Sequence, residues 1–338
     1  MKLYCGVDLH SNNGVYVVID ENDKKLLHRR LPNDLDTVLD HLGPYREDLD
    51  CVAVESTFNW YWLVDGLMDC GYPVKLANPA AIEQYDGLKD ANDDTDAFHL
   101  ALLCRLGILP TGYIYPREQR SLRDLLRRRL LFVNQRTAQI LSVQNLLSRV
   151  TGRRWGWRSL QRLDPQEMAE VLGDEFHAFT AGQQMHAIRM LSEKIKLLNA
   201  RAMESMSGVS TYEQLLTIPG TGTILGTTIT LETGEIDRFP KAGNFTSYCR
   251  ASKAKHTSNG KVKKTNNRKN GNKYLSWAFT EAAHHLIRNC DPARRFYQKK
   301  KARKNGAVAT KALASKLSKA AYYIMKNGTA FDVKRMFG

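Results

Sequence analysis

The stretch from Leu3 to Asp20 constrains the fold of this chain most strongly, because it predicts a β-hairpin that carries a charge. Apolar residues alternate from Leu3 to Leu9 and again from Val15 to Ile19, and the segment HSNNG between them is typical of a tight polar turn. Asp8 ends the first strand, where a charge is costly unless it is solvated, paired or bound to a metal ion. Taken alone, Asp8 is either a cap of the turn or a metal ligand.

The charge of the chain restricts its partners. The formal net charge is +15 over 338 residues, which favours a polyanion, with nucleic acid ahead of an anionic membrane surface. No apolar run approaches the length of a membrane span and no secretory signal precedes the first strand, so we expect a cytoplasmic protein that does not bind membranes. The six cysteines are scattered without a CxxC pair, and we expect small buried side chains in a reducing compartment, without a zinc site or disulfide framework.

Strand and helix patterns alternate through residues 1–110, which predicts a mixed sheet covered by helices. Asp8 and Glu55 both stand at the carboxyl ends of predicted strands, the edge where α/β sheets gather their chemistry. The further elements that we expect are strands at 25–31, 50–55 and 71–76 and helices at 33–42, with Asn33 as N-cap, and at 58–70.

Two more acids stand at the start of a predicted helix within Leu88–Leu106. Asp93 and Asp96 share one helical face, while Phe98, Leu102 and Leu106 form the expected apolar face. Acids in a first turn also complement the helix dipole, and that interpretation stays open.

Four carboxylates in one place would repel one another unless a cation were present. Hard divalent ions with oxygen ligands, Mg²⁺ or Mn²⁺, are the natural partners of such a group. The acids that this reasoning collects are Asp8, Glu55, Asp93 and Asp96.

These acids and their spacing resemble those of the DEDD transposases, the insertion-sequence family related to the Piv site-specific DNA invertase. The matching features are Asp8, Glu55 and the segment DDTDA at residues 93–97. The resemblance implies an RNase H-like domain of the RuvC type, in which Asp8, Glu55, Asp93 and Asp96 hold the metal ion. Asp94 is an alternative to Asp93, although the spacing to Asp96 favours Asp93.

Residues 115–208 are predicted to form a helical hairpin or coiled coil. Leucine-rich periodicity runs through Arg117–Val150 and resumes in Met185–Ser205. Between them, RRWGWRSLQR begins with Arg153 and Arg154 and combines cations with tryptophans, which suits nucleic-acid contact or a connector anchored by aromatic residues. The family resemblance implies that this segment dimerises, giving a homodimer or homotetramer.

Residues 211–338 are predicted to form a mostly helical basic domain. Its Pro-Gly-Thr-Gly turn at residues 219–222 resembles a helix-hairpin-helix turn, and a simple packing turn explains it equally well. Residues 252–274 lack any acid, so they predict either a disordered loop or a loop ordered by a phosphate backbone. The expected nucleic-acid contacts there are Lys255, Lys261, Lys263, Lys264, Arg268, Lys269 and Lys273.

Ser258 is the candidate nucleophile within this basic loop. The order Ser258, Gly260, a basic run and Lys269-Asn-Gly before a helix looks like the serine-bearing loop of the DEDD transposases. The resemblance implies that Ser258 forms a phosphoserine with DNA, and neighbouring cations would stabilise the transition state. Asn259 interrupts the family pattern, so Thr257 and Ser252 remain alternatives.

The sequence therefore predicts a DNA transposase that cuts and rejoins strands through a phosphoserine beside a divalent-metal site. The resemblance implies target DNA, donor DNA and a bridging non-coding guide RNA as partners. The alternative is a metal-dependent, structure-selective nuclease in which the acids direct hydrolysis and Ser258 takes no part.

Overall fold

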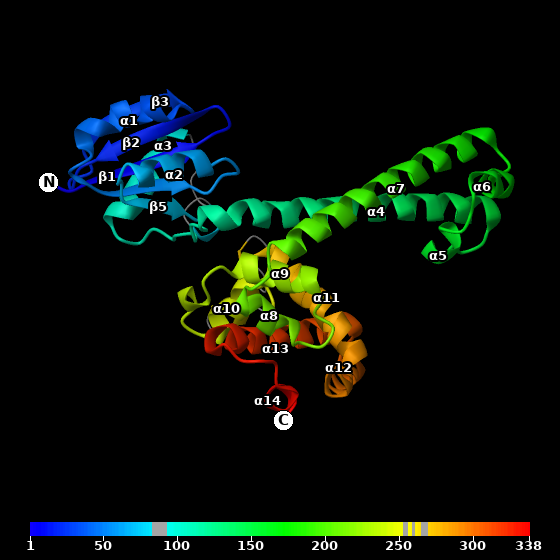
Figure 1. The fold of residues 1–338 in the computed structure, drawn as a ribbon. Coiled ribbons are helices and arrows are strands. Elements are labelled where there is room, and N and C mark those ends of the chain that lie inside the picture. The colour runs from blue at the N-terminus through cyan, green and yellow to red at the C-terminus, as the bar shows by residue number, and fades with distance from the viewer. Residues whose placement is uncertain (83–92, 253–255, 259–260, 265–269) are drawn as a thin grey trace. The chain divides into compact units, whose positions relative to one another are not determined.

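A computed structural model describes the chain except residues 83–92, 253–255, 259–260 and 265–269 (Figure 1). For residues 93–94, 256–258 and 261–264 it describes the backbone alone. The chain divides into two compact units, Met1–Ile114 and Tyr115–Gly338, called here the N-terminal and C-terminal units. A further boundary near residue 210 stays a prediction. None of the described helices combines the length and apolarity that a membrane span requires.

The N-terminal unit contains a five-stranded mixed sheet with the order β3-β2-β1-β4-β5. Strands β1, β2 and β3 pair antiparallel, whereas β4 and β5 continue the sheet parallel to β1. This confirms the α/β class and is compatible with an RNase H-like fold. The strands are β1 (Leu3–Leu9), β2 (Asn13–Ile19), β3 (Lys25–Pro32), β4 (Leu49–Glu55) and β5 (Val74–Ala77).

Helices cover both faces of this sheet, so every residue of β1 is buried. Odd-numbered β1 residues, such as Val7, share a core with α1 (Leu35–Leu42) and α2 (Tyr61–Asp69). On the opposite face, Tyr4 packs in the core formed with α3 (Asp93–Arg105). The described residues of this unit also form two short 3-10 helices, η1 (Gly43–Tyr45) and η2 (Pro79–Ala81).

The predicted helix boundaries need small corrections, and their causes are local. Helix α1 starts after Asp34, whose carboxylate accepts a hydrogen bond from Thr37 N at 2.9 Å, so Asp34 replaces Asn33 as N-cap. The Asn33 side chain instead donates to the carbonyl of His10 at 3.1 Å. Helix α2 begins at Tyr61, later than the predicted start at residue 58, and Asn78-Pro79 leads into the short η2.

The predicted apolar face of α3 is confirmed only for Phe98, which packs partly buried against the core between α3 and the sheet. Leu106 is 49% exposed, whereas Ala97 and Ala101 are fully buried against the sheet. Gly6 of β1 explains the difference, since a Cβ there would lie 1.9 Å from Ala97 O and 2.6 Å from Ala101 N. The helix backbone therefore approaches the strand through small residues, which a count of large apolar side chains does not detect.

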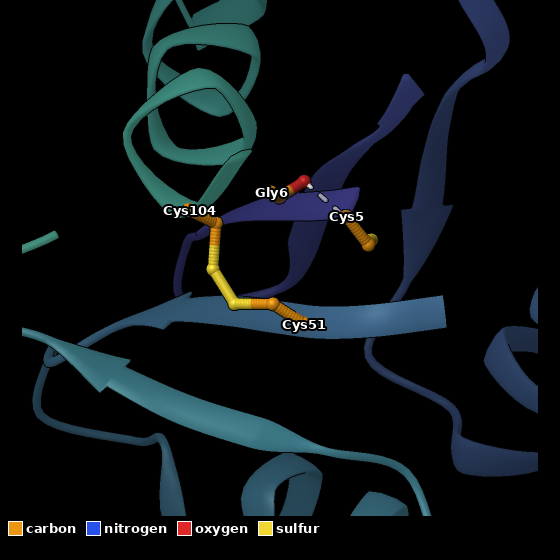
Figure 2. The surroundings of a disulfide bond; sticks show 4 residues. All are labelled: Cys5, Gly6, Cys51 and Cys104. Atoms are coloured by element: carbon orange, nitrogen blue, oxygen red, sulfur yellow. Dashed lines mark hydrogen bonds between the residues drawn. A yellow bond between two sulfur atoms is a disulfide. The ribbon is translucent and has the colours of Figure 1, made fainter. Parts of the chain in front are cut away.

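The expectation that all six cysteines are unpaired is wrong for one pair. Figure 2 shows Cys51 of β4 joined to Cys104 of α3 by a disulfide, with their Cα atoms 6.3 Å apart. Packing of α3 on β4 brings together two buried residues that are 53 positions apart in sequence. The bond links the strand that ends in Glu55 to the helix that begins with the predicted acids.

The C-terminal unit begins with an antiparallel helical hairpin, as predicted. Helix α4 (Arg117–Thr151) packs along α7 (Glu175–Glu204), and Figure 1 shows the two side by side. Helix α7 begins earlier than expected, because the Asp174 carboxylate caps it by accepting from His177 N at 2.9 Å. Helices α5 (Trp157–Leu160) and α6 (Pro165–Leu172) form the connector.

The rest of this unit is helical around one apolar core that includes Phe245, Phe279 and Tyr322. Residues 252–274, expected to be a loop, contain a two-stranded antiparallel hairpin of β6 and β7. The elements are α8 (Ser210–Leu216), α9 (Thr223–Thr233), η4 (Ile236–Arg238), α10 (Ala242–Tyr248), β6 (His256–Ser258), β7 (Lys261–Lys264), α11 (Lys273–Asn289), α12 (Asp291–Arg303), α13 (Gly306–Asn327) and α14 (Val333–Phe337).

Candidate functional site

Asp8 and Glu55 are neighbours because their strands are parallel and adjacent. Val7 of β1 is in register with Val54 of β4, and each acid directly follows its valine. Both acids have the strand parity of residues that face α3, such as Ala53. The alternation of side chains along a strand therefore directs both carboxylates toward the helix that carries Asp96.

The electrostatics of Glu55 show that three predicted acids gather here. Burial, the charge of Asp8, a hydrogen bond with Asp8 and the charge of Asp96 together raise the pKa of Glu55 to about 7, and burial is the largest of these causes. Asp8 is only 6% exposed. The surroundings do not fully compensate the negative charge of this group. Glu55 therefore retains a proton near neutral pH.

The fourth predicted acid, Asp93, is the first residue of α3, and its side chain lies outside the described residues. Within the described part of the chain, no three His, Cys, Asp or Glu side chains form a group that could hold a metal ion. The structure thus brings Asp8, Glu55 and Asp96 into one neighbourhood, and their role as metal ligands stays a prediction.

Two histidines accompany the acids and were missed by the sequence reasoning. His10 Nε2 lies 3.3 Å from Asp8 Oδ2, and the His10 carbonyl accepts a hydrogen bond from Asn59 Nδ2 at 2.8 Å. His99 lies on α3 near Asp96, where burial lowers its pKa and the Asp96 charge opposes that shift. The position of His10 two residues after Asp8 was the one signal that the sequence offered for it.

The candidate nucleophile belongs to the C-terminal unit. Ser258 ends β6 and is in register with Lys261 of β7, so the hairpin places it beside the strand that contains Lys263 and Lys264. The side chains of these four residues lie outside the described residues. The same holds for the whole of Lys255, Arg268 and Lys269.

The remaining predicted nucleic-acid contacts are exposed. Lys273 is the first residue of α11. Arg153 and Arg154 follow Gly152, the left-handed residue that ends α4, and both are exposed at the connector of the long helical hairpin. Their location on the surface is what phosphate contact requires, and the contact itself stays a prediction.

A second buried acid, Glu232 of α9, was also missed. Its side chain is enclosed and accepts hydrogen bonds from Arg123 Nε at 3.0 Å, Arg127 Nε at 2.6 Å and Asn272 Nδ2 at 2.7 Å. Burial alone would raise the pKa of Glu232, but the hydrogen bonds and charges of the two arginines outweigh it and lower the pKa. Arginines between the leucines of a long helix suggest a solvated outer face, but Arg123 and Arg127 point into the unit.

Comparison with known families covers both units. Residues 5–151, which include the predicted acids, match a family model of DEDD transposases of the IS110 type, described as Transposase. Residues 212–298, which include Ser258, match the model described as Transposase IS116/IS110/IS902 family. No curated protein matches the chain. The matches support an enzyme that acts on DNA. More specifically, they support an insertion-sequence transposase.

Proposed function

We propose that this protein cuts and rejoins DNA strands through a phosphoserine at Ser258, with a divalent cation held by Asp8, Glu55, Asp93 and Asp96. The observation that carries the proposal is the meeting of Asp8, Glu55 and Asp96 within the stretch that matches a DEDD transposase. Carboxylates that lie close together repel one another, and this repulsion favours the binding of a cation between them.

The donor set suits Mg²⁺ or Mn²⁺. All donors are carboxylate oxygens, which hard cations prefer, and a cation would replace the proton that Glu55 retains near neutral pH. A bound divalent ion would stabilise negative charge on the oxygens of a reacting phosphate. The buried Asp8 would contribute a fixed charge, and the closely packed α3 would position Asp96.

The chemical step is a phosphoryl transfer to the serine. The Ser258 hydroxyl oxygen forms a bond to phosphorus, one phosphorus–oxygen bond of the DNA backbone breaks, and the departing sugar oxygen takes up a proton as the serine loses its own. Attack on the phosphoserine by a strand hydroxyl then restores the serine and joins the new strands. The strand pairing of Ser258 with the lysine-rich β7 supports this assignment, because cations stabilise the charge that develops on the phosphate.

The proposed partners are target DNA, donor DNA and a bridging non-coding RNA, and the net charge of +15 supports binding to nucleic acid. We also propose that copies of the chain associate through the α4–α7 hairpin. Leu131, Leu141 and Leu197 on these helices are 42%, 52% and 64% exposed, which is more apolar surface than an isolated hairpin needs.

The test is a denaturant-stable adduct between the purified protein and labelled DNA carrying the element ends, with Mg²⁺ and the flanking transcript present. Ser258→Ala should abolish the adduct and leave DNA binding unchanged, whereas the matched variants Ser252→Ala and Thr257→Ala should retain it. Cleaved DNA without any adduct, persisting in Ser258→Ala, would instead establish the hydrolytic nuclease.

A further inference from the structure

The chain between Arg250 and Gly271 carries Ser258 and is called here the insertion. Its two ends are bound to each other. Arg250 precedes the insertion and has a positive φ of 54°, an uncommon conformation for a residue with a side chain. Its guanidinium reaches the far end of the insertion and donates to the Gly271 carbonyl from Nε at 3.1 Å and from Nη2 at 2.8 Å. The entry to the insertion therefore binds its exit.

The residues that follow the insertion also contact the residues that precede it. Asn272 N donates to the Tyr248 carbonyl at 2.7 Å. Gly271 has a φ of 82°, and a Cβ at this position would lie 2.5 Å from the Tyr248 carbonyl oxygen. A left-handed residue without a side chain is thus required where the two ends cross.

Asn272 has two further partners, which join this crossing to helix α9. Its Oδ1 caps α11 by accepting from Tyr274 N at 2.8 Å and from Leu275 N at 3.1 Å. Its Nδ2 donates to Glu232 Oε2 at 2.7 Å. Asn272 and Glu232 are 7% and 1% exposed, so water does not substitute for this bond.

Glu232 in turn is bound by α4. The Arg123 and Arg127 guanidiniums hold its two oxygens, with Arg127 contributing a second bond from Nη2 at 2.9 Å. Helix capping by Asn272 requires neither the buried acid nor its arginines. Apolar residues often replace such a buried charge cluster without loss of stability, so stability alone does not account for it.

We propose that Glu232 is a positioning residue for the reaction at Ser258, because through Asn272 it fixes the exit of the serine-bearing insertion relative to α4 and α9. The inference rests on the proposed function. Displacement of a reacting group by about 1 Å costs on the order of 100-fold in rate, so a bond that locks the base of the insertion affects the chemical step more than DNA binding.

Substitutions at its two ends test the bond between Asn272 and Glu232. Asn272→Asp keeps the capping oxygen of α11 but removes the donor and faces Glu232 with a second carboxylate. We expect the rate of adduct formation at saturating DNA to fall about 10-fold to 100-fold, with the Kd for DNA changed by less than about twofold. Glu232→Gln should also slow the reaction, and the double variant Glu232→Gln with Asn272→Asp should be no slower than the slower single variant, because both changes act on one bond.

The matched control is Asn305→Asp, which makes the same change at the N-cap of α13, where Asn305 Oδ1 accepts from Val308 N at 2.9 Å. This control should keep the wild-type rate. A wild-type rate in Asn272→Asp, or a double variant slowed by the product of the two single effects, would overturn the proposal.

A second measurement separates this inference from the proposed function. Hydrogen exchange of the backbone amide of residue 272 in the DNA-free protein should accelerate in Asn272→Asp, whereas the amides of Tyr274 and Leu275, whose capping oxygen is kept, should exchange as in the wild type. Unchanged exchange at residue 272 in Asn272→Asp would overturn the positioning role. Persistence of the adduct in Ser258→Ala would overturn the serine mechanism instead, whatever the exchange rates show.

Discussion

Substitution of Gly6 by alanine tests how the acidic site is assembled. The added Cβ would lie 1.9 Å from Ala97 O and 2.6 Å from Ala101 N, while ordinary contact begins at 3.4 Å, so α3 has to retreat by about 1.5 Å. Both clashing atoms belong to the helix backbone and cannot rotate away. Overpacking of this kind costs about 1–3 kcal/mol, and we expect a value of about 3 kcal/mol because the whole helix must move.

Native-state hydrogen exchange of the α3 amides in the full-length protein measures this loss. A change of about 3 kcal/mol corresponds to exchange roughly 100-fold faster. Gly43→Ala is the matched control, because Gly43 has an ordinary φ of −49° and no atom lies within 4 Å of the added Cβ. Equal exchange rates in the two variants would refute the close packing of α3 on β1 that brings Asp96 toward Asp8 and Glu55.

Three further predictions concern charge. Asp8→Asn removes a negative charge beside Glu55, so the Glu55 pKa should fall below 7 in an NMR titration of its carboxyl group, and an unchanged pKa would contradict their contact. Because the Glu232 pKa is lowered on folding, its stabilisation is complete above the unfolded value of about 4.3 and is lost as pH falls through the folded-state value. Acid should therefore weaken the C-terminal unit in urea unfolding less steeply in Glu232→Gln than in the wild type, and parallel pH profiles would contradict this. Joint replacement of Arg153 and Arg154 by alanine should reduce the slope of log affinity for DNA against log salt by about 2, and an unchanged slope would exclude phosphate contact.

Local patterns in the sequence were sufficient to predict the sheet and the position of its acids. Alternating apolar residues define β1 and β2, and two adjacent parallel strands with an acid at or next to the carboxyl end bring Asp8 and Glu55 together. The face of α3 was not predictable in this way, because it depends on how closely a helix approaches Gly6. The meeting of Cys51 and Cys104 likewise follows from that approach and from no local pattern.

The cluster of Glu232 with Arg123, Arg127 and Asn272 could not be predicted from the sequence. Glu232 ends an apolar helix, and its partners Arg127 and Asn272 stand 105 and 40 positions away in the chain. Arginine on a long amphipathic helix ordinarily indicates a solvated face, and only the packing of α4 on α9 reveals that Arg123 and Arg127 are paired inside the unit. Long-range charge pairing of this kind has no periodic signal.

The central claim is that a serine of the C-terminal unit becomes covalently joined to DNA in a reaction that needs the acids of the N-terminal unit. Mass-spectrometric mapping of the adduct, trapped with Mg²⁺ and digested to peptides, tests it most directly. The account predicts a nucleotide phosphate on Ser258 in the wild type and no adduct in Asp8→Asn. A modification on another residue, or an undiminished adduct in Asp8→Asn, would contradict it.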